Sequence, residues 1–329
     1  MTKPLPAATV PEGRVRFGAQ PQHVLMTGGT GFIGRTLIPL LLADGHAVTV
    51  WTRDASAAGR RLGGTVRCVE RLDQIAADEP CDVVINLAGT RILGPRWTAR
   101  RRQALLDSRV GTTDALVAWI AGRARKPWLL LSGSAIGYYG IQAQGDATGL
   151  TEAAPPQDIF MSQLCQRWEA AAGAATRLGV RVTCMRFGLV LGREGSLPLL
   201  QLPIALGLGG RLGSGRQWLS WIHVADLARA MAHTWILAAQ ARDVPAAQAF
   251  NFTAPGALGQ GDFTRTAAGV MHRPFWLPTP AAPVRWLLGE QADLLLEGQR
   301  VVPERLLQTG FAFVFPDAVA ALTDLREAR

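Results

Sequence analysis

The sequence predicts an α/β fold in which helices cover both faces of a doubly wound parallel sheet. Short apolar runs alternate with helical stretches from His23 to about residue 192. The runs are apolar throughout rather than alternately polar, which is typical of parallel strands buried on both faces. A glycine-rich turn links the first run to the first helix, as is common in sheets of this class.

The elements are expected in the following order. Strands are predicted at 23–28, 47–53, 66–70, 81–89, 127–133 and 180–192, and helices at 33–45, 99–122 and 159–172. Beyond residue 192 the alternation stops: 192–221 is loop-rich, 223–240 is helical, and most later prolines lie between 245 and 316. We therefore predict an N-terminal extension at 1–21, a Rossmann-type domain at 22–192, and a smaller, mixed C-terminal region at 193–329 that covers the strand ends on the substrate side.

The composition is that of a compact, soluble protein, with 48% hydrophobic and 18% charged residues. No apolar run approaches the ~18 residues of a membrane span, and the first twenty residues lack the pattern of a signal peptide. We expect a cytoplasmic protein without membrane contact. The four cysteines have no zinc-site spacing, so we expect reduced thiols and no metal; they are Cys68, Cys81, Cys165 and Cys184.

The net charge of +9 attracts phosphates or nucleic acid without specificity. The densest basic cluster is PRWTARRR, residues 95–102, which has no aromatic ladder between its arginines. A solvated helix face and an anion site both fit this cluster, and no specific nucleic-acid partner is expected.

A dinucleotide site is predicted where the first strand meets the first helix. In HVLMTGGTGFIGRTLIPLLL, residues 23–42, the first glycine permits a tight turn, the second lets the backbone approach a pyrophosphate, and the third allows close helix packing. The phosphates would meet free N–H groups and the positive end of a helix dipole. The predicted contact residues are Gly28, Thr30, Gly31, Phe32, Ile33 and Gly34.

The end of the second strand favours NADP over NAD. NAD sites commonly place a carboxylate here to accept the ribose hydroxyls, whereas this chain has Thr52 followed by Arg53. An arginine can bind a 2′-phosphate through two parallel hydrogen bonds. Asp54 is the alternative, because a shift of one residue would bring its carboxylate to the ribose.

Two later strand ends also suit a cofactor. Small residues at the end of INLAG let the backbone pass close to a ligand, and the segment from Gly188 to Val190 can offer a backbone N–H to a nicotinamide carboxamide. For each segment alone, a buried strand end is an equal alternative.

These motifs resemble those of a known family. TGGTGFIG, INLAG, LSGSAIGYYG, RFGLVLG and WIHVADLARA occur in the order found in extended short-chain dehydrogenases/reductases, the NAD(P)-dependent sugar epimerase and dehydratase superfamily. NLAGTRILGPRWT, LLDSRVGTT, CQRWEAAA and the tail LLLEGQRVVPERLLQTGFAFVFP resemble an atypical branch called epimerase family proteins. The tail, at about 275–325, resembles that branch's C-terminal domain of unknown function.

The resemblance implies a Rossmann core that binds NADP(H). It implies that Thr52 and Arg53 hold the 2′-phosphate and that Arg109 reaches the cofactor from the long helix. From the residues alone, Arg109 would be a charge on a helix face. The remaining cofactor residues that the resemblance implies are Leu87, Ala88, Gly89 and Val190.

The chain lacks the proton-transfer pair of this superfamily. Active members use a tyrosine and a lysine four residues later on the helix at 159–172, where this chain has Met161 and Cys165. General acid–base catalysis contributes roughly 10²–10⁴ in rate. The catalytic candidates that remain are Ser134, at the place of the superfamily's helper serine, and Tyr138 and Tyr139, the only tyrosines of the chain.

Cys165 has no clear activating neighbour for a role as nucleophile. His223 can titrate near neutrality, but in the superfamily its segment closes the fold. On the substrate side, Leu219 stands where nucleotide-sugar enzymes carry a diphosphate-binding arginine, and Arg216 is the nearest replacement. A pocket that is aromatic as well as polar is expected at Gln217, Trp218, Trp221 and His223.

The leading hypothesis is an NADP(H)-binding protein of epimerase or oxidoreductase type with an unidentified small-molecule substrate. The alternative is a non-catalytic NADP(H) sensor or interaction module, which the missing tyrosine and lysine favour. A homodimer is an open possibility for its assembly.

Overall fold

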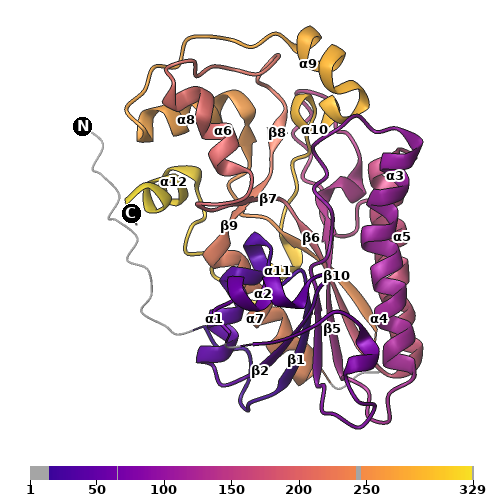
Figure 1. Cartoon of the computed structure of the whole chain (residues 1–329). Helices are drawn as coiled ribbons and strands as arrows, with labels where there is room; N and C mark the ends of the chain where they lie inside the picture. The colour runs from indigo at the N-terminus through magenta and orange to yellow at the C-terminus, as the bar shows by residue number, and fades with distance from the viewer. Residues whose placement is uncertain (1–14, 65, 242–245, 328–329) are drawn as a thin grey trace.

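The computed structural model describes residues 15–64, 66–241 and 246–327. A seven-stranded sheet in the order β10-β6-β5-β4-β1-β2-β3 forms the centre of the molecule (Figure 1), and all of its strand pairs are parallel. The strands are β1 (His23–Thr27), β2 (Ala47–Trp51), β3 (Arg67–Val69), β4 (Val83–Asn86), β5 (Leu129–Ala135), β6 (Arg181–Phe187) and β10 (Ala247–Phe252). The predicted doubly wound α/β fold is confirmed.

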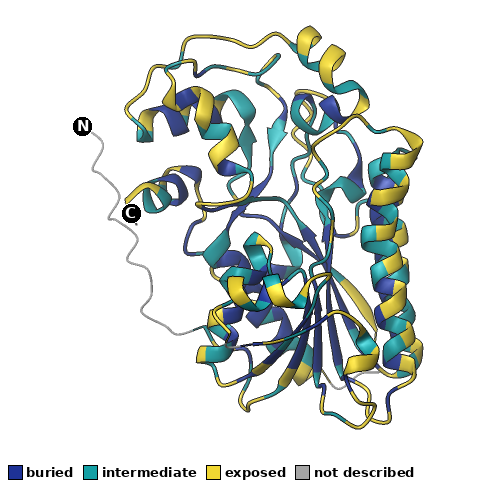
Figure 2. Ribbon diagram, viewed as in Figure 1, coloured by how far each residue is buried: buried dark blue, intermediate teal, exposed yellow. Residues whose placement is uncertain are grey.

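Helices cover both faces of this sheet. On one face lie α1 (Phe32–Ala43) and α7 (Val224–Gln240), which pack against each other. On the other lie α4 (Thr112–Ala121) and α5 (Phe160–Gly173). The strands between them are buried along most of their length (Figure 2), because apolar side chains on both faces of each strand meet a helical layer.

The long helix predicted at 99–122 is interrupted. It consists of α3 (Ala99–Leu106), a π-helical turn η2 (Asp107–Gly111) and α4. Such π-helical turns are rare and are frequent at functional sites. The short helix α2 (Ala55–Arg61) links β2 to β3.

The strand predicted at 180–192 divides at Gly188 into β6 and β7 (Leu189–Leu191), and β7 pairs with β9 (Trp221–His223). A Cβ atom on Gly188 would lie 2.7 Å from the backbone oxygen of Ser220, so only glycine allows this close passage.

The sheet and its core extend beyond both predicted boundaries of the Rossmann-type domain. At the N-terminal side, residues 1–14 lie outside the described residues, but Phe17 is fully buried, and its ring centroid lies 5.7 Å from that of Trp235. At the other side, β10 completes the sheet from beyond residue 192. Pairing of β10 with β6 is a long-range contact, which a local reading of the sequence does not show.

A smaller body covers the carboxyl edge of the sheet (Figure 1). Its elements are α6 (Leu197–Ala205), β8 (Trp218–Leu219), β11 (Leu258–Gly259), α8 (Gln260–Val270), α9 (Ala281–Leu288), α10 (Asp293–Leu296) and α12 (Ala318–Glu327), whereas α11 (Glu304–Gln308) packs against β10 of the sheet. The bridges Gln142–Gly298 and Leu150–Val301 join it to the segment that follows β5. None of the helices in the described part of the chain has the length and apolar character needed to cross a membrane.

Candidate functional site

The glycine turn between β1 and α1 is shaped by close backbone approaches. Gly28 has φ +69°, and a Cβ atom there would lie 2.6 Å from the carbonyl oxygen of Leu87. A Cβ on Gly34 would lie 2.5 Å from the carbonyl oxygen of Gly28. The N–H of Gly31 closes the turn by donating to the Gly28 oxygen at 2.9 Å. The turn therefore requires glycine at both of these tight positions.

The ends of β1 and β4 are tied together beside this turn. The Thr27 hydroxyl donates to Oδ1 of Asn86 at 2.7 Å and accepts from the backbone N–H groups of Leu87 and Ala88 at 3.1 and 3.0 Å. β1 and β4 are neighbours at the point where the strand order reverses, and sheets of this class bind ligands there. Thr27 and Asn86 were missed as positioning residues, although both are polar residues that end apolar runs.

The remaining predicted residues of the turn lie at its mouth. Thr30 is half-buried, Gly31 is exposed, and Phe32 and Ile33 are half-buried at the start of α1. The Phe32 ring rests on Gly192, where a Cβ atom would come within 2.1 Å of it. The loop after β7 therefore passes directly over the N-terminus of α1.

The two charged residues at the end of β2, Asp54 and Arg53, have different environments. The carboxylate of Asp54 caps α2, accepting from the N–H of Ala57 at 2.8 Å. Arg53 is exposed and has no ion pair within the described residues, and Thr52 is half-buried beside it. Because Asp54 is engaged by its own helix, the free charge at this strand end is positive.

Arg109 projects from the π-helical turn η2 onto the end of β4. Its Nη2 donates to the carbonyl oxygen of Thr90 at 3.0 Å, and a Cβ atom on Gly89 would lie 3.2 Å from its Cζ. The guanidinium also lies over the Trp168 ring, 5.4 Å from the centroid. Burial lowers the pKa of Arg109 from its ordinary value. The residue thus lies between α5 and the strand end rather than on an open helix face.

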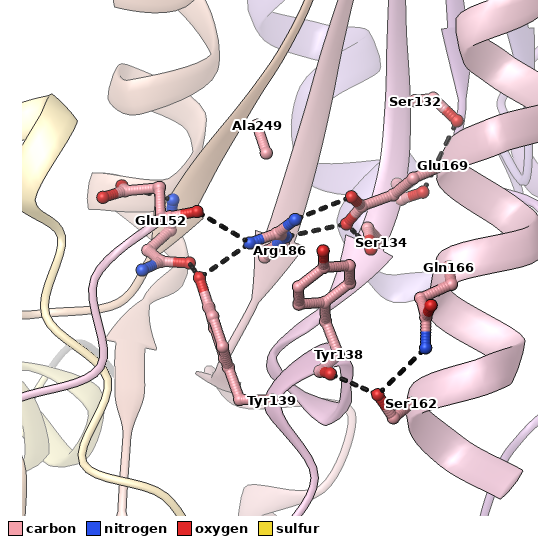
Figure 3. A network of polar contacts seen from close by, with 12 residues as sticks. Ser132, Ser134, Tyr138, Tyr139, Glu152, Ser162, Gln166, Glu169, Arg186 and Ala249 are labelled. Atoms are coloured by element: carbon pink, nitrogen blue, oxygen red, sulfur yellow. Dashed lines mark hydrogen bonds and ion pairs between the residues drawn. The ribbon is translucent and has the colours of Figure 1, made fainter. Parts of the chain in front are cut away.

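Ser134 belongs to a buried polar network that the sequence did not predict (Figure 3). Its hydroxyl donates to Oε1 of Glu169 at 2.7 Å, and Glu169 also accepts from Nε and Nη2 of Arg186 at 2.8 Å each. Arg186 Nη1 donates to the Tyr139 hydroxyl at 2.9 Å. A signal for the pair did exist: Arg186 is a charge inside an apolar run, and Glu169 lies one helical turn after Cys165.

The two tyrosines have different environments. Tyr139 is buried, and its hydroxyl donates to Oδ1 of Asn251 at 2.6 Å while accepting from Arg186. Burial raises its pKa, although Arg186 opposes the change. The expectation that Tyr139 donates a proton is therefore corrected: its hydroxyl is occupied by the fold.

Tyr138 is half-buried, and its ring centroid lies 3.4 Å from Cζ of Arg186. Within the described residues its hydroxyl forms no hydrogen bond. Of the two tyrosines, Tyr138 is the one whose hydroxyl stays available.

The helix α5 presents Met161 and Cys165 toward the segment after β5. A Cβ atom on Gly137 would lie 3.1 Å from Cε of Met161 and 3.8 Å from Sγ of Cys165. Burial raises the pKa of Cys165 to about 12, with Glu169 adding to the effect. The thiol is therefore neutral at physiological pH and is a poor nucleophile, as the sequence indicated.

Two residues predicted for the substrate pocket are instead packed inside the fold. Trp221 is fully buried, and its indole N–H donates to the Gly256 oxygen at 3.1 Å. Gln217 is buried as well, and its Nε2 donates to the carbonyl oxygens of Leu212 and Leu295 at 3.0 and 3.1 Å. The N–H groups of both side chains donate to backbone carbonyls, and the Gln217 side-chain oxygen accepts from the Ser214 hydroxyl at 3.4 Å, so their assignment to a pocket is corrected.

Two cavities flank these buried residues. The larger, of about 610 Å³, has Arg211, Arg216, Trp218 and Trp276 among its lining residues. The smaller, of about 440 Å³, is bordered by Phe32, Arg35 and His223 among others. Arg216 and Trp218 line the larger cavity, whereas Gln217 between them is buried.

His223 caps α7. Its Nδ1 accepts from the N–H of Ala225 at 3.1 Å, its ring centroid lies 4.0 Å from that of Phe315, and its Nε2 lies 3.3 Å from Oδ2 of Asp324. These contacts indicate that His223 holds the fold together, as its segment does in the superfamily, rather than acting on a substrate. Val190, in β7, is half-buried and pairs with Ile222.

The strand order and the glycine turn at the switch point define a Rossmann-type dinucleotide-binding protein. The chain belongs to the NAD dependent epimerase/dehydratase family, whose profile matches residues 24–251. A second profile, a domain of unknown function named DUF1731, matches residues 279–325. The resemblance seen in the sequence is thus confirmed in both of its parts.

Similar proteins share nearly the whole length of the chain. An epimerase family protein of Staphylococcus saprophyticus is 39% identical over 92% of this chain and 99% of its own length. The human epimerase family protein SDR39U1 is 38% identical over 92% of this chain and 99% of its own length. The crystal structure of human SDR39U1 with NADPH superposes with a TM-score of 0.81 at 34% identity, covering 94% of this chain and 100% of that one.

A structure of UDP-galactose 4-epimerase has a TM-score of 0.71 at 19% identity and covers 93% of this chain and 99% of that one, which shows a shared fold alone.

Proposed function

We propose that the chain binds NADP(H) and uses it to exchange a hydride with a carbonyl or alcohol carbon of a small-molecule substrate. The observation that carries the cofactor assignment is the division of charges at the end of β2. Asp54 is engaged as the cap of α2, which leaves the exposed Arg53 to meet a 2′-phosphate. The similarity to human SDR39U1, which was crystallised with NADPH, supports the same cofactor.

The turn residues fit the phosphates of such a cofactor. Glycines at 28 and 34 allow the backbone to come close, and Thr27 holds Leu87 and Ala88 against the turn. Thr30, Gly31, Phe32 and Ile33 would contact the pyrophosphate and adenine side, and Gly89, Arg109 and Val190 the nicotinamide side. The cofactor, when bound, would supply or accept the hydride.

Proton chemistry is assigned to Ser134 and Tyr138. The Ser134 hydroxyl has its proton committed to Glu169, so its oxygen can accept a hydrogen bond from a substrate hydroxyl. The Tyr138 hydroxyl is available, and its ring is held in place by the Arg186 guanidinium, which lies 3.4 Å from the ring centroid. The Tyr138 hydroxyl would donate a hydrogen bond to a substrate carbonyl oxygen and so polarise it, while the Ser134 oxygen would accept from a substrate hydroxyl.

The substrate side favours an anionic or polar ligand with a flat portion. Arg211, Arg216 and Trp218 line the larger cavity, and arginine and tryptophan together suit a planar ligand that carries negative charge. Cytoplasmic placement and a homodimer stay predictions from the sequence.

A non-catalytic NADP(H) sensor is the second candidate, because Met161 and Cys165 occupy the places of the catalytic tyrosine and lysine. A methionine cannot transfer a proton, and Cys165 keeps its own at neutral pH. In this function, the bound cofactor would order the surface formed by the smaller body.

The two functions are distinguished by incubating the NADPH-loaded protein with a panel of aldehydes, ketones and sugars while following the nicotinamide absorbance. Turnover that falls with Tyr138→Phe supports the enzyme. Tight NADPH binding with no turnover across the panel favours the sensor.

A further inference from the structure

Arg109 carries a charge that no described carboxylate neutralises. Its polar contacts are all to uncharged oxygens: the carbonyls of Thr90 and Leu105 at 3.0 and 3.4 Å and the Ser108 hydroxyl at 3.3 Å. Arg186, which also lies beside α5, has its charge balanced by Glu169. A partly buried guanidinium without a counter-ion costs folding free energy, which a bound ligand can offset.

The position of this charge is fixed at the carboxyl end of β4. Gly89 lies against the guanidinium so closely that a Cβ atom there would be 3.2 Å from its Cζ and Nη2. β4 borders β1 at the switch point, on the side opposite β2. A dinucleotide whose adenine half lies over β2 extends across this point, so its nicotinamide half falls on the side of β4 and β5.

The same charge also lies next to the position that the superfamily gives to lysine. η2 packs against α5, and Arg109 and Cys165 are close enough to act on each other: the guanidinium opposes the rise in the pKa of the thiol. Arg109 on η2 thus places a positive charge beside the position where α5 has the neutral thiol of Cys165.

We propose that Arg109 takes over the positive charge of the missing lysine beside the nicotinamide, and that this charge makes the site prefer NADPH to NADP⁺. This inference rests on the proposed NADP(H) binding. The nicotinamide ring is positively charged in NADP⁺ and neutral in NADPH, so a fixed neighbouring cation repels only the oxidised form. Arg53 acts at the phosphate common to both forms and does not distinguish them.

The test compares dissociation constants for NADP⁺ and NADPH, measured by calorimetry on the full chain. The variants are Arg109→Gln, Arg109→Lys and, as a matched control, Arg100→Gln, which removes an exposed charge from α3. We expect the wild type to bind NADPH more tightly. Arg109→Gln should reduce that preference on the order of tenfold, whereas Arg109→Lys and Arg100→Gln should keep it.

The outcomes separate this inference from the proposed function. If both forms bind and Arg109→Gln leaves their ratio unchanged, Arg109 does not select the redox state, while NADP(H) binding stands. If Arg109→Gln fails to fold, the wild type still decides, because equal or tighter binding of NADP⁺ overturns the inference. Binding of neither form by the wild type overturns the proposed function and this inference with it.

Discussion

The carboxylate of Glu169 on α5 accepts two hydrogen bonds, each 2.8 Å long, from the guanidinium of Arg186 on β6. The side chains are only 14% and 5% exposed, so the pair is largely removed from water. Arg186 also donates a hydrogen bond to the Tyr139 hydroxyl, and Glu169 also accepts one from the Ser134 hydroxyl. The pair therefore attaches α5 to β6 of the sheet. This is the helix on which the superfamily has its catalytic tyrosine and lysine.

Replacing Glu169 by Gln should destabilise the fold strongly. The substitution keeps the shape but leaves the Arg186 charge unpaired in a buried place, a situation that costs about 3–5 kcal/mol. Denaturant unfolding followed by circular dichroism measures the loss. Glu290→Gln is the matched control, since its pair with Arg102 is exposed, and such pairs contribute at most about 1 kcal/mol. Equal losses in the two variants would show that the buried pair has no special importance.

The glycine turn could be predicted from the sequence, whereas the Glu169–Arg186 pair could not. The turn was predictable because its chemistry is local: strand, glycines and helix follow one another within residues 23–42. The ion pair joins residues 17 positions apart in sequence on two different elements, so its existence depends on how α5 packs on β6. Composition gives only a hint of it, as a charge within an apolar strand.

The substrate side was harder to predict, for a different reason. Gln217 and Trp221 are residue types that often line pockets, but here backbone carbonyls bind their polar atoms and the smaller body buries them. The carbonyl partner of Trp221 is at Gly256, and one of those of Gln217 is at Leu295. Burial of this kind depends on the tail, whose position no local pattern determines.

Tyr139→Phe should reduce the stability of the fold, whereas Tyr138→Phe should reduce turnover. Loss of the Tyr139 hydroxyl leaves buried polar groups of Asn251 and Arg186 unsatisfied, which costs about 1–3 kcal/mol in the free energy of unfolding. Tyr138→Phe should change that free energy by less than about 0.5 kcal/mol, and should lower whatever turnover is found. Chemical denaturation and the carbonyl panel measure the two effects. A larger stability loss from Tyr138→Phe would contradict the assignment of Tyr139 to the fold.

Acid should weaken the fold in part through His223. Burial lowers its pKa below the ordinary value of 6.5, against the opposing influence of Asp324. A depressed pKa means that this contribution is present above pH 6.5 and is lost as the pH falls, because protonation removes the Nδ1 acceptor that caps α7. The unfolding free energy measured between pH 8 and pH 5 should therefore decrease toward acid.

His223→Asn should flatten that pH dependence, since asparagine can cap a helix at any pH. Part of the dependence should persist, because burial also lowers the pKa values of His46 and His233. An unchanged slope in His223→Asn would place the acid sensitivity elsewhere.

Gly34→Ala should abolish cofactor binding and destabilise the turn. The added methyl group would lie 2.5 Å from the Gly28 oxygen and 2.6 Å from Cα of Gly29, both backbone atoms that cannot move aside cheaply. Gly269→Ala in α8 is the matched control, as its methyl group meets nothing within 4 Å and should stabilise the helix by about 0.5–1 kcal/mol. NADPH binding that survives Gly34→Ala would argue against phosphate contact at this turn.

The most direct test of the central claim is a calorimetric titration of the wild type and of Arg53→Ala with NADP⁺ and with NAD⁺. The claim is that the turn after β1 binds a dinucleotide and that Arg53 contacts its 2′-phosphate. It predicts that the wild type binds NADP⁺ ten- to a hundredfold more tightly than NAD⁺, from one charge-assisted contact of about 1.5–3 kcal/mol, and that Arg53→Ala removes this preference without weakening NAD⁺. Equal losses for both cofactors in Arg53→Ala, or no binding of either by the wild type, would contradict it.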